Sequence, residues 1–105
     1  MDSQIEVNGV FYDVKEVAET DVKLLFNYSL VNGLCDAEKR IIYINKDRSI
    51  NKKMQTLAHE LTHAYLCETL LHKDEYNVEE VCNIMGKYVF LISNKILDFY
   101  KEEMI

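Results

Sequence analysis

The spacing of apolar residues changes near residue 49, and this change limits the chain to a fold that mixes strands and helices. Before this point, apolar and polar residues alternate with period two. In the segment "IEVNGVFYDV", the pair Asn8-Gly9 separates two alternating runs, which predicts a β-hairpin. Two further strands are expected at about Asn27–Cys35 and Arg40–Asn45, whereas residues 13–24 fit either a strand or a short helix.

Beyond this point the apolar spacing becomes helical. Ser49 or Asn51 is expected to cap a first helix that runs to about Leu71. The stretch "HKDEYN" interrupts the pattern, and a second helix is expected from about Asn77 to Lys101. The apolar stripes of the two helices are expected to be Met54, Leu57, Ala58, Leu61, Ala64 and Tyr65 in the first, and Val78, Val81, Cys82, Met85, Val89, Ile92, Ile96 and Phe99 in the second.

The chain length of 105 residues suits one domain with a modest core. Residues 1–105 are therefore expected to form a single unit, mainly β over 1–48 and mainly α over 49–105. The chain has no proline and only three glycines, a composition that favours long helices over many tight turns. The predicted fold class is α+β: a small, mostly antiparallel sheet packed against two long helices.

Charge and composition argue against several classes of protein. The net charge is −6 and no cluster of Lys and Arg is present, so nucleic acid is not expected as a partner. The longest apolar run, Tyr88 to Ile92, is too short to span a bilayer. The first residues, "MDSQIEVNG", carry no secretory signal, and the three widely spaced cysteines form no disulfide framework, so a cytoplasmic location is expected.

The segment "TLAHELTHAYLCE" carries two histidines four residues apart, His59 and His63, with Glu60 between them. Residues at this spacing share one face of a helix, so both imidazoles can reach one metal ion. Glu60 lies about 100° around the helix, where it can contact a metal-held water without being a ligand. The histidines fall opposite the apolar stripe, and a chance match to H-E-x-x-H is rare in a chain this short. The motif therefore predicts a catalytic metal site, with a helix that carries two histidines by coincidence as the alternative.

A catalytic zinc site needs a third protein ligand and one open position. Thr69 and Leu70 stand where a third histidine of the H-E-x-x-H-x-x-G-x-x-H pattern belongs, so that solution is excluded. On the wheel of the second helix, Glu80 falls opposite the core and Glu79 on its flank, which favours Glu79 as the ligand over a dipole-stabilising role at the helix start. Asn83, one turn later, is placed to hydrogen-bond a ligand histidine. The candidates for the third ligand are His72, Asp74, Glu75, Glu79, Glu80 and the cysteines.

"HELTH" followed by "EEVCNIMG" resembles the gluzincin clan of zinc metallopeptidases. In that clan, H-E-x-x-H is followed on a later helix by a ligand glutamate and, four positions on, by an acidic residue. Glu79 matches the glutamate, whereas Asn83 stands where an aspartate is usual. The short spacing and the small size are similar to minigluzincins and to ImmA/IrrE-like metallopeptidases, over about residues 34–92.

The resemblance implies a minimal zincin-like core that holds one zinc ion per chain through His59, His63 and Glu79. It implies that Glu60 acts as general base for peptide hydrolysis on the zinc-activated water. The implied function is a zinc endopeptidase of narrow specificity, with a protein or peptide substrate such as a transcriptional repressor. Two alternatives stay open: a zinc-bound regulatory module without turnover, and a latent peptidase plugged by its own "DFYKEEMI" segment.

The resemblance also implies how substrate binds. An edge strand at Arg40–Asn45 would pair with an extended peptide, with Ile42 or Tyr43 lining the cleft. Members of the clan often use a tyrosine or histidine to stabilise the oxyanion. The sequence leaves three candidates for this role, Tyr65, His72 and Tyr76.

Overall fold

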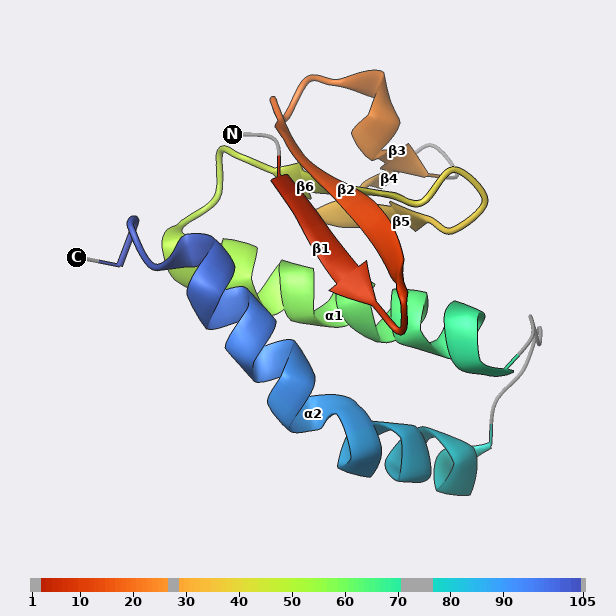
Figure 1. The fold of residues 1–105 in the computed structure, drawn as a ribbon. Coiled ribbons are helices and arrows are strands. Elements are labelled where there is room, and N and C mark those ends of the chain that lie inside the picture. Colours follow the sequence, from red (N-terminus) through yellow and green to blue (C-terminus); the bar gives the residue numbers. More distant parts are fainter. Residues whose placement is uncertain (1–2, 27–28, 71–76, 105) are drawn as a thin grey trace.

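A computed structural model describes residues 3–26, 29–70 and 77–104; the side chains at 70, 78–79, 82–84 and 86–87 are not described. Both helices lie on one side of a four-stranded sheet, and a small two-stranded ribbon stands at one end of it (Figure 1). No helix in these ranges is long and apolar enough to cross a bilayer. The elements are β1 (Ser3–Val7), β2 (Val10–Val17), the 3₁₀ helix η1 (Val22–Leu24), β3 (Leu25–Phe26), β4 (Ser29–Leu30), β5 (Gly33–Asp36), β6 (Ile41–Asn45), α1 (Ile50–Leu70) and α2 (Val78–Tyr100).

The four-stranded sheet has the order β1-β2-β6-β5 and is mostly antiparallel, as predicted. The β1–β2 turn confirms the hairpin expected at Asn8-Gly9. Both residues have positive φ angles, 51° and 94°, which a two-residue turn between twisted strands requires. β2 and β6 pair in parallel. The segment that fitted either a strand or a helix contains both, the end of β2 and η1.

The expectation that Arg40–Asn45 forms an edge strand is wrong. This segment is β6, which pairs with β2 on one side and with β5 on the other. Its side chains are buried on both faces of the sheet: Ile42, 0% exposed, belongs to the core, whereas Tyr43, 8% exposed, lies near Lys23 of η1. A strand whose side chains are buried is most stable when the backbone groups on both of its edges are also hydrogen-bonded. β6 therefore lies inside the sheet, and β5 forms the edge near α1.

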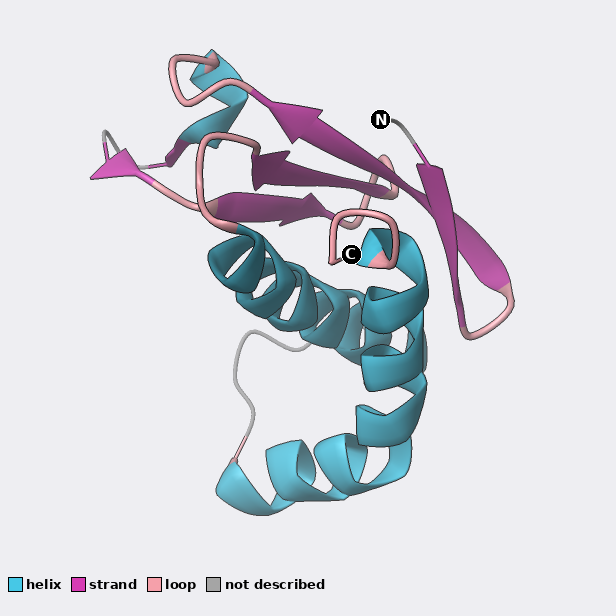
Figure 2. Cartoon of the chain, turned by 90° about the vertical axis from the view of Figure 1, so that its left-hand side faces the viewer, coloured by secondary structure: helices cyan, strands magenta, loops and turns pink. Residues whose placement is uncertain are grey.

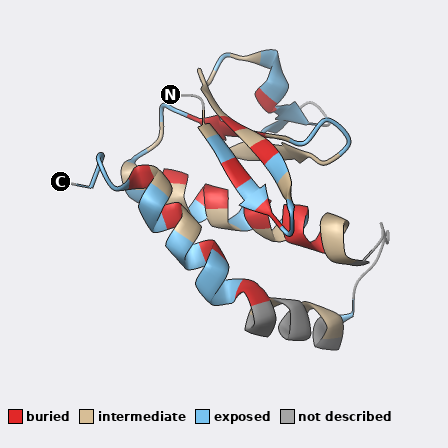
Figure 3. Cartoon of the chain, in the orientation of Figure 1, coloured by how far each residue is buried: buried red, intermediate tan, exposed pale blue. Residues whose placement is uncertain are grey.

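The core lies between the sheet and the inner faces of the helices (Figure 3). The stripe predicted on α1 is confirmed: Leu57, Leu61 and Tyr65 are fully buried. On α2 the prediction is partly wrong, because Val89 is exposed and the preceding Tyr88 is buried. The ring of Tyr88 stacks on that of Tyr65 with centroids 4.6 Å apart, and this aromatic pair buries more surface than a valine can.

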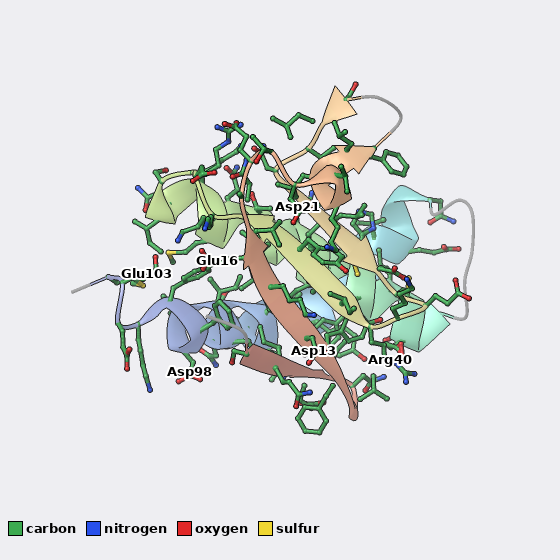
Figure 4. All side chains as sticks on the ribbon, turned by 90° about the horizontal axis from the view of Figure 1, so that it is seen from above. Asp13, Glu16, Asp21, Arg40, Asp98 and Glu103 are labelled. Atoms are coloured by element: carbon green, nitrogen blue, oxygen red, sulfur yellow. The ribbon has the colours of Figure 1, made fainter. Side chains whose placement is uncertain are left out.

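The C-terminal turn of the chain is fixed to the start of α1 by a buried cation. Lys53 Nζ donates to a carboxylate oxygen of Glu16 on β2 at 3.1 Å and to one of Glu103 at 2.8 Å. It also lies over the ring of Tyr100, 5.4 Å from the centroid. Glu16 and Glu103 can be followed in Figure 4, near the C-terminal end of α2. The C-terminal segment "DFYKEEMI", considered above as a plug of the active site, is thus bound to the start of α1 through Glu103 and Tyr100.

We expect Lys53→Ala to lower the free energy of unfolding by about 1–3 kcal/mol, since it leaves the buried Glu16 carboxylate without its cation. Lys52→Ala is the matched control, because Lys52 pairs with no described carboxylate and should change stability by less than about 0.5 kcal/mol. Urea denaturation of both variants measures the difference. Equal stability of the two would mean that the C-terminal turn is not anchored through Lys53.

Candidate metal centre

α1 brings His59, Glu60 and His63 together, with Glu60 packed against Gly33 of β5. One potential ligand atom from each lies within 4.8 Å of the others, and the two imidazole centroids are 4.9 Å apart. The two histidines are exposed, whereas Glu60 is 7% exposed. Two accessible imidazoles beside a buried carboxylate are the arrangement that the H-E-x-x-H spacing predicts.

The Glu60 carboxylate is held by the neighbouring strand. The backbone N–H of Cys35 on β5 faces this carboxylate and lowers its pKa. Burial raises the pKa of the Glu60 carboxyl above its ordinary value, while His59 and the Cys35 N–H oppose this rise. The pKa of a carboxyl raised toward neutrality suits a group that must both accept and release a proton.

The donor set fits a divalent metal ion of the zinc type. Zinc prefers imidazole nitrogen and carboxylate oxygen, and a histidine binds it in the neutral form. Partial burial lowers the pKa of His63, and His59 beside it lowers it further, so the neutral imidazole is favoured. Among the described side chains, His59, Glu60 and His63 are the group of His, Cys, Asp and Glu residues close enough to hold an ion.

β5 offers an unpaired backbone edge beside this group. The N–H of Asn45 donates to the carbonyl of Asn32 at 2.8 Å, which makes these two a hydrogen-bonded pair. Because hydrogen-bonded and open pairs alternate in an antiparallel ladder, Gly33 and Cys35 direct their backbone groups away from β6. The Cys35 N–H that reaches Glu60 is one of these groups. No strand among the described residues pairs with this edge.

A pocket of about 460 Å³ opens between α1 and the β4–β5 segment. His59 and Glu60 stand at one end of it, and Lys52 and Gln55 line the same helix further toward its start. Figure 2 shows the β3–β4 ribbon projecting from the sheet near the beginning of α1. No residue of the C-terminal segment lines this pocket, so its described part is not a plug.

The third ligand expected at Glu79 falls in the first turn of α2, but the side chains of Glu79 and Asn83 lie outside the described residues. Glu80 has a structural role: its backbone N–H donates to Oδ1 of the N-cap Asn77 at 2.8 Å, and its carboxylate accepts from Asn77 Nδ2 at 3.3 Å. This reciprocal cap gives the acid at position 80 a role at the start of α2. The ligand role of Glu79 stays a prediction.

Of the three residues considered for the oxyanion, Tyr65 alone lies among the described residues. His72 and Tyr76 lie outside the described residues. Tyr65 is buried on the core side of α1, where its hydroxyl bonds to Lys95. Ile42 and Tyr43, expected to line the cleft, are buried on β6. Tyr65, Ile42 and Tyr43 are not among the described residues that line the His59–Glu60 pocket.

Sequence reasoning missed the contribution of β5, for which a glycine inside a strand-like run was the available signal. A Cβ atom on Gly33 would lie 2.5 Å from Thr56 Cγ2, 2.9 Å from the Tyr43 carbonyl oxygen and 3.4 Å from Glu60 Cγ. The absence of a side chain therefore lets β5 pack closely on α1. This close packing brings the free edge of β5 to Glu60.

We expect Gly33→Ala to lower the free energy of unfolding by about 1–3 kcal/mol, because the added methyl group overpacks the β5–α1 contact. Thermal or urea denaturation measures the loss. The double variant Gly33→Ala, Thr56→Ala removes the shortest contact and should recover part of the overpacking term relative to Thr56→Ala alone. A Gly33→Ala variant as stable as the wild type would contradict the close approach.

Comparison with known proteins finds one family that matches most of the chain. The model of the IrrE N-terminal-like domain family, Peptidase_M78, matches residues 16–104, which include all of α1 and α2. No match was found among curated proteins or among solved structures. The family match confirms the resemblance to ImmA/IrrE-like proteins. Because it covers most of the sequence, the chain belongs to the IrrE N-terminal-like domain family, and it is a metallopeptidase-like or IrrE/ImmA-like regulatory domain.

Proposed function

We propose that this protein is a zinc-dependent endopeptidase. The observation that carries the proposal is the placement of Glu60: its carboxylate is buried and held by Cys35, between two accessible histidines and at the end of an open pocket. A site that only stabilises the fold has no need of an acid that lies beside the metal ligands. The family match supports a metallopeptidase-like domain and leaves the reaction itself to experiment.

His59 and His63 would hold the zinc ion, with Glu79 proposed as the third protein ligand. When bound, zinc supplies a Lewis acid that lowers the pKa of water and polarises a peptide carbonyl. The described residues supply two imidazole nitrogen ligands on one helix face, which leaves room for a third ligand and for substrate.

Glu60 is the proposed general base and acid. Its carboxylate accepts a proton from the attacking water, and the resulting carboxyl group later donates that proton to the leaving amine. The Cys35 N–H beside the carboxylate favours its charged form, while burial keeps its pKa above the ordinary value. Both effects prepare one side chain for two successive proton transfers.

The substrate would bind as an extended strand along the free edge of β5. Gly33 directs its backbone N–H and C=O toward that edge, and the pocket beside it leads to His59 and Glu60. Main-chain hydrogen bonds along an edge strand position a peptide with little dependence on its side chains. One strand edge and one pocket offer few contacts, so the proposed action is limited cleavage of a protein partner such as a transcriptional repressor.

The metal ligands can be tested by elemental analysis of purified protein. We expect about one zinc per chain in the wild type and strong loss of zinc in His59→Ala, His63→Ala and Glu79→Ala. Glu80→Ala is the matched control, because its acid caps α2 and should not hold metal. Zinc retained in both histidine variants would rule out this centre. Loss in Glu80→Ala but not in Glu79→Ala would exchange the roles of the two acids.

Glu60→Gln separates a peptidase from a module that only binds metal. The amide keeps the size of the side chain and can still accept the Cys35 hydrogen bond, but it does not accept a proton from water. We expect zinc content and melting temperature to be retained, while cleavage of a peptide mixture falls by about 10²–10⁴-fold. Mass spectrometry of the digests measures the cleavage. A Glu60→Gln variant that cleaves as fast as the wild type would remove Glu60 from the mechanism.

A further inference from the structure

We infer that the pocket beside the metal centre selects an acidic side chain of the substrate, and that Lys52 is the residue that recognises it. This inference rests on the proposed peptidase function, because it places the acidic residue on the same bound peptide. It assigns a substrate preference to a residue that the H-E-x-x-H motif does not include.

The pocket is continuous from the metal centre to Lys52. Its α1 wall is a single helix face: Lys52, Gln55 and Thr56 lead in steps of three or four residues to His59. The opposite wall is formed by residues 30–33, which lead into β5. A peptide that pairs with the edge of β5 therefore passes both Glu60 and Lys52.

Lys52 differs from its neighbours Arg48 and Lys53 because no described carboxylate pairs with it. Its Nζ contacts the neutral Gln55 Oε1 at 3.4 Å, and no described carboxylate lies within ion-pair distance. The adjacent Lys53 binds two carboxylates, and Arg48 pairs with Glu19 at 2.7 Å. Lys52 is therefore a half-buried cation that lines a pocket and has no carboxylate partner among the described residues. Such a cation can bind an anionic group of a ligand.

Other charges in the pocket do not neutralise this position. Glu60 is the acid among the described lining residues, and its carboxylate is already engaged by Cys35 at the far end. The first turn of α1 contains no acidic residue, so the positive end of the helix adds to the charge of Lys52. In a chain with a net charge of −6, this end of the pocket is a local exception.

The spacing predicts where the acidic residue lies in the substrate. Lys52 and His59 are seven positions apart on α1, about 10 Å along the helix axis. An extended peptide covers this distance in about three residues. The preferred substrate therefore carries Asp or Glu about three residues from the bond that is cut, on the side that runs toward the start of α1.

Digestion of a synthetic peptide library with randomised positions tests the preference. We expect the zinc-loaded wild type to favour Asp or Glu at one position about three residues from the cut. Lys52→Glu should lower the ratio of acidic to basic residues there by about fivefold or more, since charge reversal replaces an attraction by a repulsion. Lys46→Glu is the matched control, with the same charge change on an exposed residue outside the pocket.

Peptide binding to zinc-loaded Glu60→Gln tests Lys52 without turnover. The probes are two fluorescent peptide pools that differ only in Glu or Lys at the position of interest, measured by anisotropy. We expect the Glu pool to bind more tightly than the Lys pool, and Lys52→Glu in this background to reverse the order. Neutral Lys52→Gln should abolish the preference and serves if the reversed charge unfolds the protein.

The two experiments distinguish the inference from the proposed function. Cleavage by the wild type without any acidic preference, or a preference unchanged in Lys52→Glu, would overturn the role of Lys52 while the peptidase stands. No cleavage by any form, together with Lys52-dependent binding of the Glu pool, would overturn the peptidase and keep the recognition site. Equal binding of both pools would overturn the recognition site in either case.

Discussion

The close contact between β5 and Glu60 is the interaction on which the site depends. It joins the free edge of β5 to the helix that carries both histidines, so one interaction sets the position of the acid and of the strand beside it. The contact requires β5 to lie close to α1, which Gly33 allows because it has no side chain. An acid held in this way is oriented before any substrate arrives, and pre-orientation is a large part of what an active site supplies.

Burial of a carboxylate disfavours its charged form, and Glu60 shows this cost as a raised pKa. The rest of the fold offsets the cost with apolar contacts between α1, α2 and the sheet, including the stacked Tyr65 and Tyr88. A second buried charge, Lys53, is compensated directly by two carboxylates. Among the described residues, the charge of the buried Lys53 is therefore neutralised by its neighbours, whereas that of the buried Glu60 is only partly compensated. The partly compensated group is the one proposed to do chemistry.

Neighbouring lysines on α1 show how position decides function. Lys53 points into the core and fastens the C-terminal turn, whereas Lys52 points into the pocket beside the metal centre. Their side chains are chemically identical and differ by about 100° around the helix. Because of this difference in direction, Lys53 has a structural role, whereas Lys52 is available to bind a ligand.

The sequence by itself determined the hairpin at Asn8-Gly9, the extents of the helices and the grouping of His59, Glu60 and His63, because these depend on contacts between residues close in the chain. It also identified the family to which the chain belongs. The tertiary structure alone decided which strand lies at the edge of the sheet, which aromatic residue of α2 enters the core, and that Cys35 and Gly33 meet Glu60. Strand order and close packing arise from pairings between segments far apart in sequence. Local periodicity carries no information about such pairings. The alternating pattern within β5 or β6 stays the same whichever strand pairs with it.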